Sequence, residues 1–88
     1  MDDGRPLRHF PDTYSIKAVG KDSDDFAMHA ETIVASVVDA PDTVTHKTRE
    51  SKNGTYLSVT VYFVARDQQE LDLVFTTVNA DDRVVWVL

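Results

Sequence analysis

The fold is decided by residues 52–64, which read KNGTYLSVTVYFV. Asn53-Gly54 accommodates the positive φ angles of a type I′ turn, so we expect an antiparallel hairpin here. After the turn the side chains alternate with the period of two that is typical of a strand. One face is wholly apolar and is predicted to lie in the core; it carries Leu57, Val59, Val61 and Phe63. The other is polar but rich in aromatic surface; it carries Tyr56, Ser58, Thr60, Tyr62 and Val64.

Two further strands are predicted upstream of this one. Residues 43–51 are β-branched or charged and alternate only weakly, which is typical of an exposed edge strand whose charges prevent further pairing. Residues 14–19 alternate cleanly, and Gly20 ends the run. One face of this first strand carries Tyr14, Ile16 and Ala18, and the other carries Ser15, Lys17 and Val19.

Two amphipathic helices and a final strand complete the pattern. The first helix is predicted from Asp24 to Asp39, because aspartates at its start suit the free N–H groups and the positive end of the dipole, and Ala40-Pro41 ends it. The second helix is predicted from Gln68 to Asn79, after a capping-box variant. Their apolar stripes are Phe26, Ala30, Ile33, Val34 and Val37, and Leu71, Val74, Phe75 and Val78. The final strand spans residues 83–88, with Val84, Trp86 and Leu88 facing inward and Trp86 in the core.

The order strand, helix, strand, strand, helix, strand predicts an α+β fold. Each helix has one apolar stripe, so both are expected on the same face of a four-stranded antiparallel sheet, the ferredoxin-like βαββαβ sandwich. Right-handed crossovers place the first and third strands in the centre. Residues 13–88 are the predicted domain, and residues 1–12, with Gly4 and two prolines, are a predicted flexible N-terminal arm.

The composition narrows the class of protein. The chain has 88 residues, 15 acidic against 9 basic, a net charge of −6 and no cysteine. Its length allows one small domain with a modest core, and the absence of cysteine excludes disulfides, a thiolate nucleophile and cysteine-bound zinc. No apolar run approaches the roughly 20 residues of a membrane helix, and residues 1–10 lack a signal-peptide core. We therefore expect a cytoplasmic protein that does not bind membranes.

Three segments carry a family resemblance. Phe10-Pro11, residues 51–61 (SKNGTYLSVTV) and residues 84–88 (VVWVL) make the chain from Phe10 to Leu88 resemble the YbeD-like family of small uncharacterised bacterial proteins. The resemblance implies a ferredoxin-like fold akin to ACT domains, which are small regulatory modules that sense amino acids at dimer interfaces. It implies no catalytic residues. The loop after the first strand, residues 19–23, lacks the glycine-rich ligand loop that is common in amino-acid-sensing ACT domains.

The residues that could carry out catalysis do not occur in the spacings that known catalytic sites use. His9, His29 and His46 include no pair at i, i+4, so we predict no metal site. The acidic clusters at residues 22–25 and 81–82 occupy helix-start and turn positions, where aspartate already has a conformational role. Phosphate-binding, nucleotide-binding and nucleophile-elbow motifs are missing from the sequence. We therefore predict a binding protein rather than an enzyme, without a cofactor.

The uncovered sheet face is the predicted binding surface. A mixed apolar and polar patch of this kind is typical of an interaction site for a protein partner or a small metabolite. The final strand has almost no charge after Arg83, so its edge is also expected to pair with another copy or another protein. The candidate residues are Lys17, Val19, Tyr56, Tyr62, Val64, Val85 and Val87.

The second candidate surface is the basic hairpin. Residues 43–66 hold four basic residues and one acidic residue, whereas the rest of the chain holds five basic and 14 acidic residues. The hairpin patch consists of His46, Lys47, Arg49 and Lys52. Together with Tyr56 and Tyr62 it forms the alternative hypothesis, weak RNA binding by base stacking. The net charge of −6 opposes this alternative, and a charged edge that only prevents aggregation is the simpler interpretation.

Overall fold

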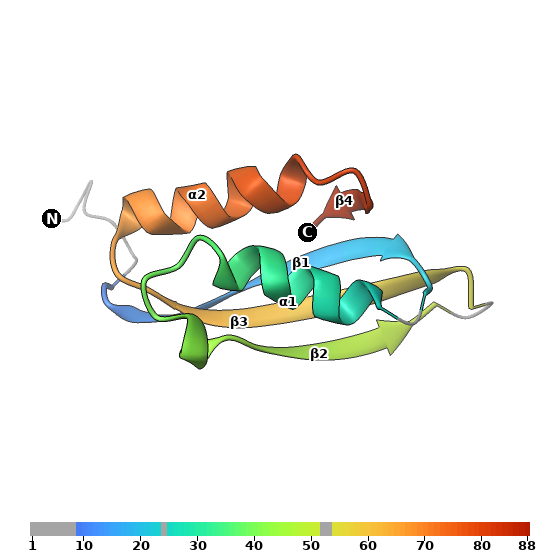
Figure 1. Ribbon diagram of the computed structural model, residues 1–88, viewed down its shortest axis with the longest axis horizontal. Coiled ribbons are helices and arrows are strands. Elements are labelled where there is room, and N and C mark those ends of the chain that lie inside the picture. Colours follow the sequence, from blue (N-terminus) through green and yellow to red (C-terminus); the bar gives the residue numbers. More distant parts are fainter. Residues whose placement is uncertain (1–8, 24, 52–53) are drawn as a thin grey trace, which may run out of the picture.

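Four strands and two helices follow one another in the predicted order. The computed structural model describes residues 9–23, 25–51 and 54–88. The elements are β1 (Asp12–Lys21), α1 (Phe26–Ala35), a 3-10 turn η1 (Pro41–Thr43), β2 (Thr45–Glu50), β3 (Tyr56–Ala65), α2 (Gln68–Asn79) and β4 (Val84–Val87) (Figure 1). The described residues thus form the ferredoxin-like α+β sandwich that the hydrophobic pattern predicts.

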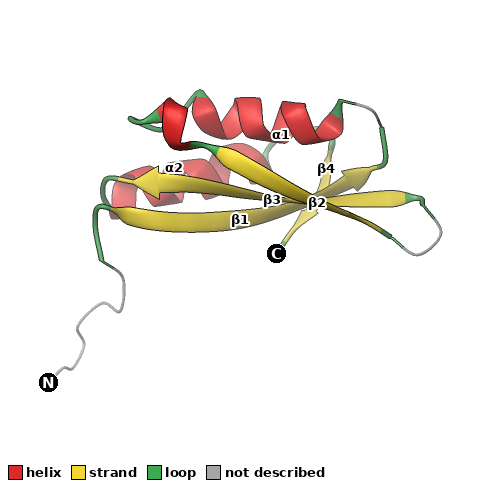
Figure 2. Ribbon diagram, turned by 90° about the horizontal axis from the view of Figure 1, so that it is seen from below, coloured by secondary structure: helices red, strands yellow, loops and turns green. Residues whose placement is uncertain are grey.

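The sheet is antiparallel with the strand order β2-β3-β1-β4, so the first and third strands are central, as predicted. β1 and β3 pair along their whole length, from Asp12 opposite Ala65 to Lys21 opposite Tyr56. Both helices lie on one face of the sheet, and the opposite face carries no helix (Figure 2). We call this opposite face the open face.

The core lies between the sheet and the helices. The four residues predicted on the apolar face of β3 are all buried, from Leu57 to the fully covered Phe63. Phe26 and Val34 of α1 and Leu71, Val74 and Val78 of α2 pack against them. Phe75 was predicted in the same stripe but is 37% exposed, because it lies on the flank of α2 beside the short β4.

A buried carboxylate joins the two helices. Asp67 is the N-cap of α2 and accepts a hydrogen bond from the Glu70 N–H at 2.9 Å, which confirms half of the predicted capping box. Glu70 is only 6% exposed. Its two oxygens accept from the N–H groups of Arg66 and Asp39, each at 2.9 Å, so it ties the start of α2 to the loop after α1.

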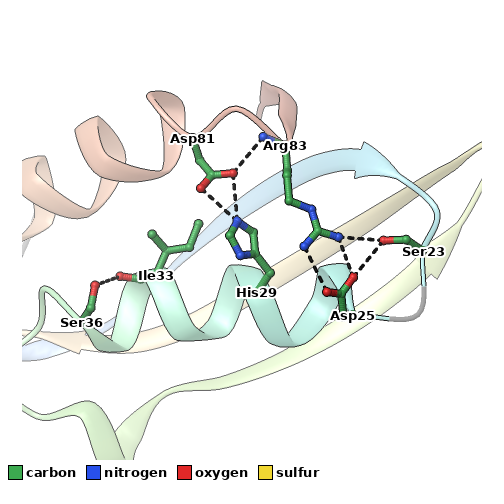
Figure 3. A network of polar contacts seen from close by, with 7 residues as sticks. All are labelled: Ser23, Asp25, His29, Ile33, Ser36, Asp81 and Arg83. Carbon is green, nitrogen blue, oxygen red and sulfur yellow. Dashed lines mark hydrogen bonds and ion pairs between the residues drawn. The ribbon is translucent and has the colours of Figure 1, made fainter.

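The first helix is shorter than predicted. It ends at Ala35 and not at Asp39, because Ser36 Oγ donates to the Ile33 carbonyl at 2.6 Å and the Val37 N–H turns to Val34 (Figure 3). These bonds satisfy the last carbonyls without any glycine or proline. The predicted start is also different: α1 begins at Phe26, and the Asp25 side chain makes no capping bond. Asp24 lies outside the described residues.

The final strand differs most from the prediction. Ala18 lies opposite Val87 and Val19 opposite Trp86, but Gly20 lies opposite Val84, so the register shifts. The extra residue is Val85, and such a bulge reverses the alternation of side chains. As a result Trp86 is 44% exposed and Leu88 69% exposed, so their predicted place in the core is wrong. Val84 and Val87 pack against the core instead.

Gly20 sits where three segments approach closely. A Cβ atom at this position would lie 2.5 Å from Phe26 Cζ and 2.7 Å from the Arg83 carbonyl oxygen. No side chain fits there without a shift of the backbone of the loop before β4.

Residues just before the first strand contact Tyr14 of β1. Residues 1–8 of the predicted arm lie outside the described residues. The ring of Phe10 stacks on Tyr14 with 5.2 Å between centroids, and the Tyr14 hydroxyl donates to the His9 carbonyl. His9 and Phe10 therefore contact the first strand, and β1 already begins at Asp12.

Candidate functional site

Positive charges line up across the open face. The strand register places Lys17 of β1, Thr60 of β3 and Lys47 of β2 in one row. In the next row Val19, Ser58 and Arg49 lie side by side. Because side chains alternate along a strand, all of these residues point away from the helices.

The open face has no negative charge of its own among the described strand residues. Glu50 of β2 lies opposite the buried Leu57 and belongs by alternation to the helix side. A depression of about 200 Å³ lies over the central rows; it is lined by Lys17, Lys47, Thr48, Arg49, Ser58, Thr60 and Tyr62. The Lys47 ammonium group lies 5.8 Å from the centre of the Tyr62 ring, within the range of a cation–π contact. The surface is therefore suited to a negatively charged ligand.

An aromatic pair lies at the β4 end of the open face. The rings of Tyr56 and Trp86 are 5.5 Å apart and tilted by 51°. Val19, opposite Trp86 in the register, is only 4% exposed although it points away from the helices. Trp86 was missed as a surface residue because the bulge is invisible in the alternation of β4. The signal that could have found it is Gly20, since an isolated glycine in a strand pattern suggests a bulge.

Most of the predicted surface residues lie where the sequence placed them. The residues that belong to the open face are Lys17, Val19, Tyr56, Tyr62, Val64, Lys47 and Arg49. Val85 is the exposed bulge residue, and Val87 faces the helix side, so its predicted place on the open face is wrong. His46 is also misplaced, because its ring bonds to the Glu31 carboxylate of α1. Lys52 lies outside the described residues.

A polar network on the opposite side of the molecule fixes the loop before β4 to α1. The Arg83 guanidinium donates to both Asp25 oxygens, at 2.7 and 3.3 Å, and to Ser23 Oγ at 2.8 Å (Figure 3). Its Cζ lies 5.7 Å from the centre of the Phe26 ring. The Arg83 guanidinium holds the pKa of the Asp25 carboxyl below its usual value. Asp25 therefore acts as the partner of Arg83.

Asp81 forms the second half of this network. His29 Nε2 lies 3.0 and 2.9 Å from the two Asp81 oxygens, and the Arg83 N–H donates to Asp81 Oδ1 at 2.9 Å. Burial raises the pKa of the Asp81 carboxyl, but the hydrogen bonds from His29 and from the Arg83 backbone outweigh it, and the pKa lies below its usual value. Both aspartates thus have structural partners.

These two carboxylates predict a pH dependence of stability. A carboxyl group whose pKa is lower in the folded state than in the unfolded chain stabilises the fold above its unfolded pKa, here 3.8, and this contribution is lost as the pH falls through the folded pKa. We expect the free energy of unfolding to decrease as the pH is lowered below this value. In Asp81→Asn the decrease should be less steep. Urea unfolding at several acidic pH values measures this. An unchanged slope in the variant would contradict the role of Asp81.

No cluster of three metal-binding side chains occurs in the described ranges, and none of the helices there is long and apolar enough to cross a membrane. Beside the network, a depression of about 340 Å³ is lined by Lys21, Ser23, Phe26, Asp82, Arg83 and Val85. The Arg83 guanidinium in this depression is already paired with Asp25.

Comparison with known families agrees with this structure. Residues 5–88 match the family described as "Protein of unknown function (DUF493)". The chain belongs to this family. The resemblance to the YbeD-like proteins, predicted from the sequence, is thereby confirmed, and this family has no assigned activity.

Two bacterial relatives of this DUF493 chain extend over nearly its whole length. A UPF0250 protein of Shewanella halifaxensis is 33% identical over 82 residues, covering 93% of this chain and 91% of the relative. The UPF0250 protein NE1487 of Nitrosomonas europaea is 29% identical, covering 93% and 94%. The solution structure of HP0495 from H. pylori aligns with a TM-score of 0.73 at 17% identity, over 99% of this chain and 91% of that one. This neighbour supports the ferredoxin-like fold of the DUF493 chain.

Proposed function

We propose that the protein is a non-catalytic binding and regulatory module, similar in its fold to ACT domains, that binds an acidic segment of a partner protein on its open face. The observation that carries the proposal is the alignment of Lys17, Lys47 and Arg49 on a surface whose described strand residues include no carboxylate. A small metabolite fits less well, because the depression over these residues, about 200 Å³, is smaller than typical small-molecule sites of about 300–1,000 Å³.

The carboxylates that give the net charge of −6 lie outside the described strand residues of the open face. Charges separated by more than a Debye length, about 8 Å at physiological ionic strength, are largely screened from each other. The three carboxylates of the helices, Glu31 of α1 and Glu70 and Asp72 of α2, belong to elements on the other side of the sheet from Lys17 and Lys47. A ligand on the open face therefore interacts mainly with the cations beside it.

Single-stranded RNA is the second candidate for the same surface. Trp86 favours it, because the bulge adds this ring to Tyr56 and places an aromatic pair beside the cations. Unpaired bases stack on exposed aromatic rings, with about 1–3 kcal/mol per base. Acidic peptides do not depend on such stacking, so the two ligands are distinguishable by the Trp86→Ala variant.

The test is a titration with two probes, a decaglutamate peptide and a ten-residue oligouridylate, followed by amide chemical shifts. We expect decaglutamate to shift resonances on the open face. Lys47→Gln and Arg49→Gln should each weaken its binding by about two- to fivefold, the range expected for exposed ion pairs. Arg66→Gln is the matched control: it removes the same charge from an exposed side chain at the start of α2 and should bind normally.

The outcomes separate the candidates. If decaglutamate shifts no open-face resonance, or if Arg66→Gln weakens binding as much as Lys47→Gln, the proposed site is wrong. If oligouridylate binds more tightly than decaglutamate, depends steeply on salt and loses affinity in Trp86→Ala, RNA binding replaces the binding of an acidic segment as the proposed function.

A further inference from the structure

β4 leaves part of the neighbouring strand unpaired. It pairs with β1 only from Ala18 to Gly20, and the last bonds join Lys17 to Leu88, with N–O distances of 3.4 and 2.8 Å. β1 itself extends back to Asp12. Figure 1 shows β4 ending part-way along β1. Residues 12–16 therefore have a paired edge toward β3 and a second edge that no described strand covers.

The backbone groups on this second edge can be assigned from the strand pattern. Lys17 exchanges both of its bonds with Leu88, and in an antiparallel strand every second residue points its N–H and C=O to the same side. Ser15 and Thr13 therefore point toward the uncovered edge, and Ser15 is exposed. The Thr13 N–H is held by its neighbour Asp12, whose Oδ1 accepts it at 2.7 Å. The groups available for pairing are those of Ser15 and the carbonyl of Thr13.

The two edges of the sheet differ in charge. β2, at the other edge, carries Lys47, Arg49 and Glu50, which is the usual protection against unwanted pairing. The uncovered edge of β1 has no charged side chain from Thr13 to Ile16. It is therefore not protected in this way.

An apolar groove lies at the end of this edge. It has a volume of about 360 Å³ and is lined by Phe75, Thr76, Asn79, Val87 and Leu88. Phe75 and Leu88 are both exposed large apolar side chains. A strand added beside β1 would continue the line of β4 and reach this groove.

We propose that a second copy of this chain occupies the edge, with the two β1 strands antiparallel about a two-fold axis at Tyr14. Thr13 of one copy then lies opposite Ser15 of the other, and each such pair exchanges N–H and C=O bonds. In the dimer the Thr13 N–H donates to the carbonyl of the partner's Ser15 instead of to the Asp12 side chain. The result is one continuous sheet of eight strands with both open faces on the same side.

A second copy is favoured because the edge is complementary to itself. The central pairs, Thr13 with Ser15 and Tyr14 with Tyr14, set neutral side chains against neutral side chains, and Asp12 lies opposite the uncharged Ile16, so no like charges face each other directly. A two-fold axis repeats each of these contacts on both sides. The two Lys17 residues lie six positions apart along the strands, about 20 Å at about 3.3 Å per residue, where salt screens their repulsion. Because each copy carries a net charge of −6, added salt strengthens this association, whereas it weakens binding of an anion to the open face.

The first test combines sedimentation equilibrium with amide hydrogen exchange on the full chain, from about 20 µM to about 1 mM protein, since dimer formation depends on protomer concentration. We expect a dimer at the higher concentration, with slower exchange at Ser15 but no change at β2. A monomer at about 1 mM, or a dimer without slower exchange at Ser15, would overturn the proposal.

The second test is a charge swap. Ser15→Lys and Thr13→Glu each place like charges diagonally across the two-fold axis, so each variant alone should dimerise less than the wild-type chain. A mixture of the two sets Lys opposite Glu, and should form heterodimers about two- to fivefold more readily than either homodimer, as expected for cross-strand charge pairs. Thr45→Lys on the exposed β2 edge is the control and should dimerise normally.

Failure here is distinguishable from failure of the proposed function. The pairing does not use Lys47 or Arg49, so the glutamine variants of those residues should dimerise like the wild-type chain. Equal association of the mixture and of the single variants would overturn the two-fold pairing, and would leave decaglutamate binding unaffected.

Discussion

Glu70→Ala is expected to lower the free energy of unfolding by about 1–3 kcal/mol, because it leaves the partly buried Arg66 and Asp39 N–H groups without their acceptor. The effect is large because the Glu70 side chain is almost fully buried and both of its oxygens are used. The measurement is urea unfolding at neutral pH, with the slope against denaturant compared between variants to exclude a change in the unfolded state.

Glu70→Gln is the matched variant for this prediction. Its amide oxygen can accept one of the two bonds, but its NH₂ group faces a donor in place of the other oxygen. We expect its stability to lie between the wild-type protein and Glu70→Ala. A Glu70→Ala protein as stable as the wild type would show that water satisfies both N–H groups, and that the carboxylate does not join the helices.

Gly20→Ala is expected to lower the free energy of unfolding by about 1–3 kcal/mol, the usual range for an extra methyl group in a packed site. The upper end applies here because one of the three clashing atoms, the Arg83 carbonyl oxygen, belongs to the backbone. Phe26 Cζ can move only by displacing a core ring, and the Arg83 carbonyl only by moving the loop before β4. Thermal and urea unfolding measure the loss.

Two further variants identify the cause of this loss. Gly54 has φ of +73°, and no heavy atom lies within 4 Å of the place that a Cβ atom would take, so Gly54→Ala tests backbone conformation without a clash. Gly54→Ala should lower the free energy of unfolding by about 1–2 kcal/mol. Combining Gly20→Ala with Phe26→Leu removes the contact with the Phe26 ring and keeps the one with the Arg83 carbonyl. The double variant should therefore lose less stability than the two single variants added together. Strict additivity would show that the Phe26 ring does not contribute to the clash.

The strongly periodic elements were predictable from the sequence. β3 and α2 match the prediction because their alternation and spacing are regular, and because Asp67 and Glu70 mark the start of the helix. The end of α1 was not predictable in the same way. A serine hydroxyl bonded to a carbonyl three residues earlier ends this helix, and the pattern of apolar residues continues past it.

The parts of the sites that depend on long-range contacts could not be read from local patterns. His29 and Asp81 are 52 residues apart, and Arg83 and Asp25 are 58 apart, so no spacing rule links them. The alignment of Lys17 with Lys47 depends on the register of three strands. His46 is different, because alternation along β2 already places it on the opposite face from Lys47, and that signal was present in the sequence.

The separation of charge between the two faces also affects how fast a partner is found. The cations Lys17, Lys47 and Arg49 of the open face and the three carboxylates of α1 and α2, on the other side of the sheet, form an electric dipole directed across the sheet. An approaching anion exerts a torque on this dipole and turns the open face toward itself before contact. Such steering raises the rate of productive encounters at low ionic strength. The uncovered face thus influences the kinetics of recognition as well as its chemistry.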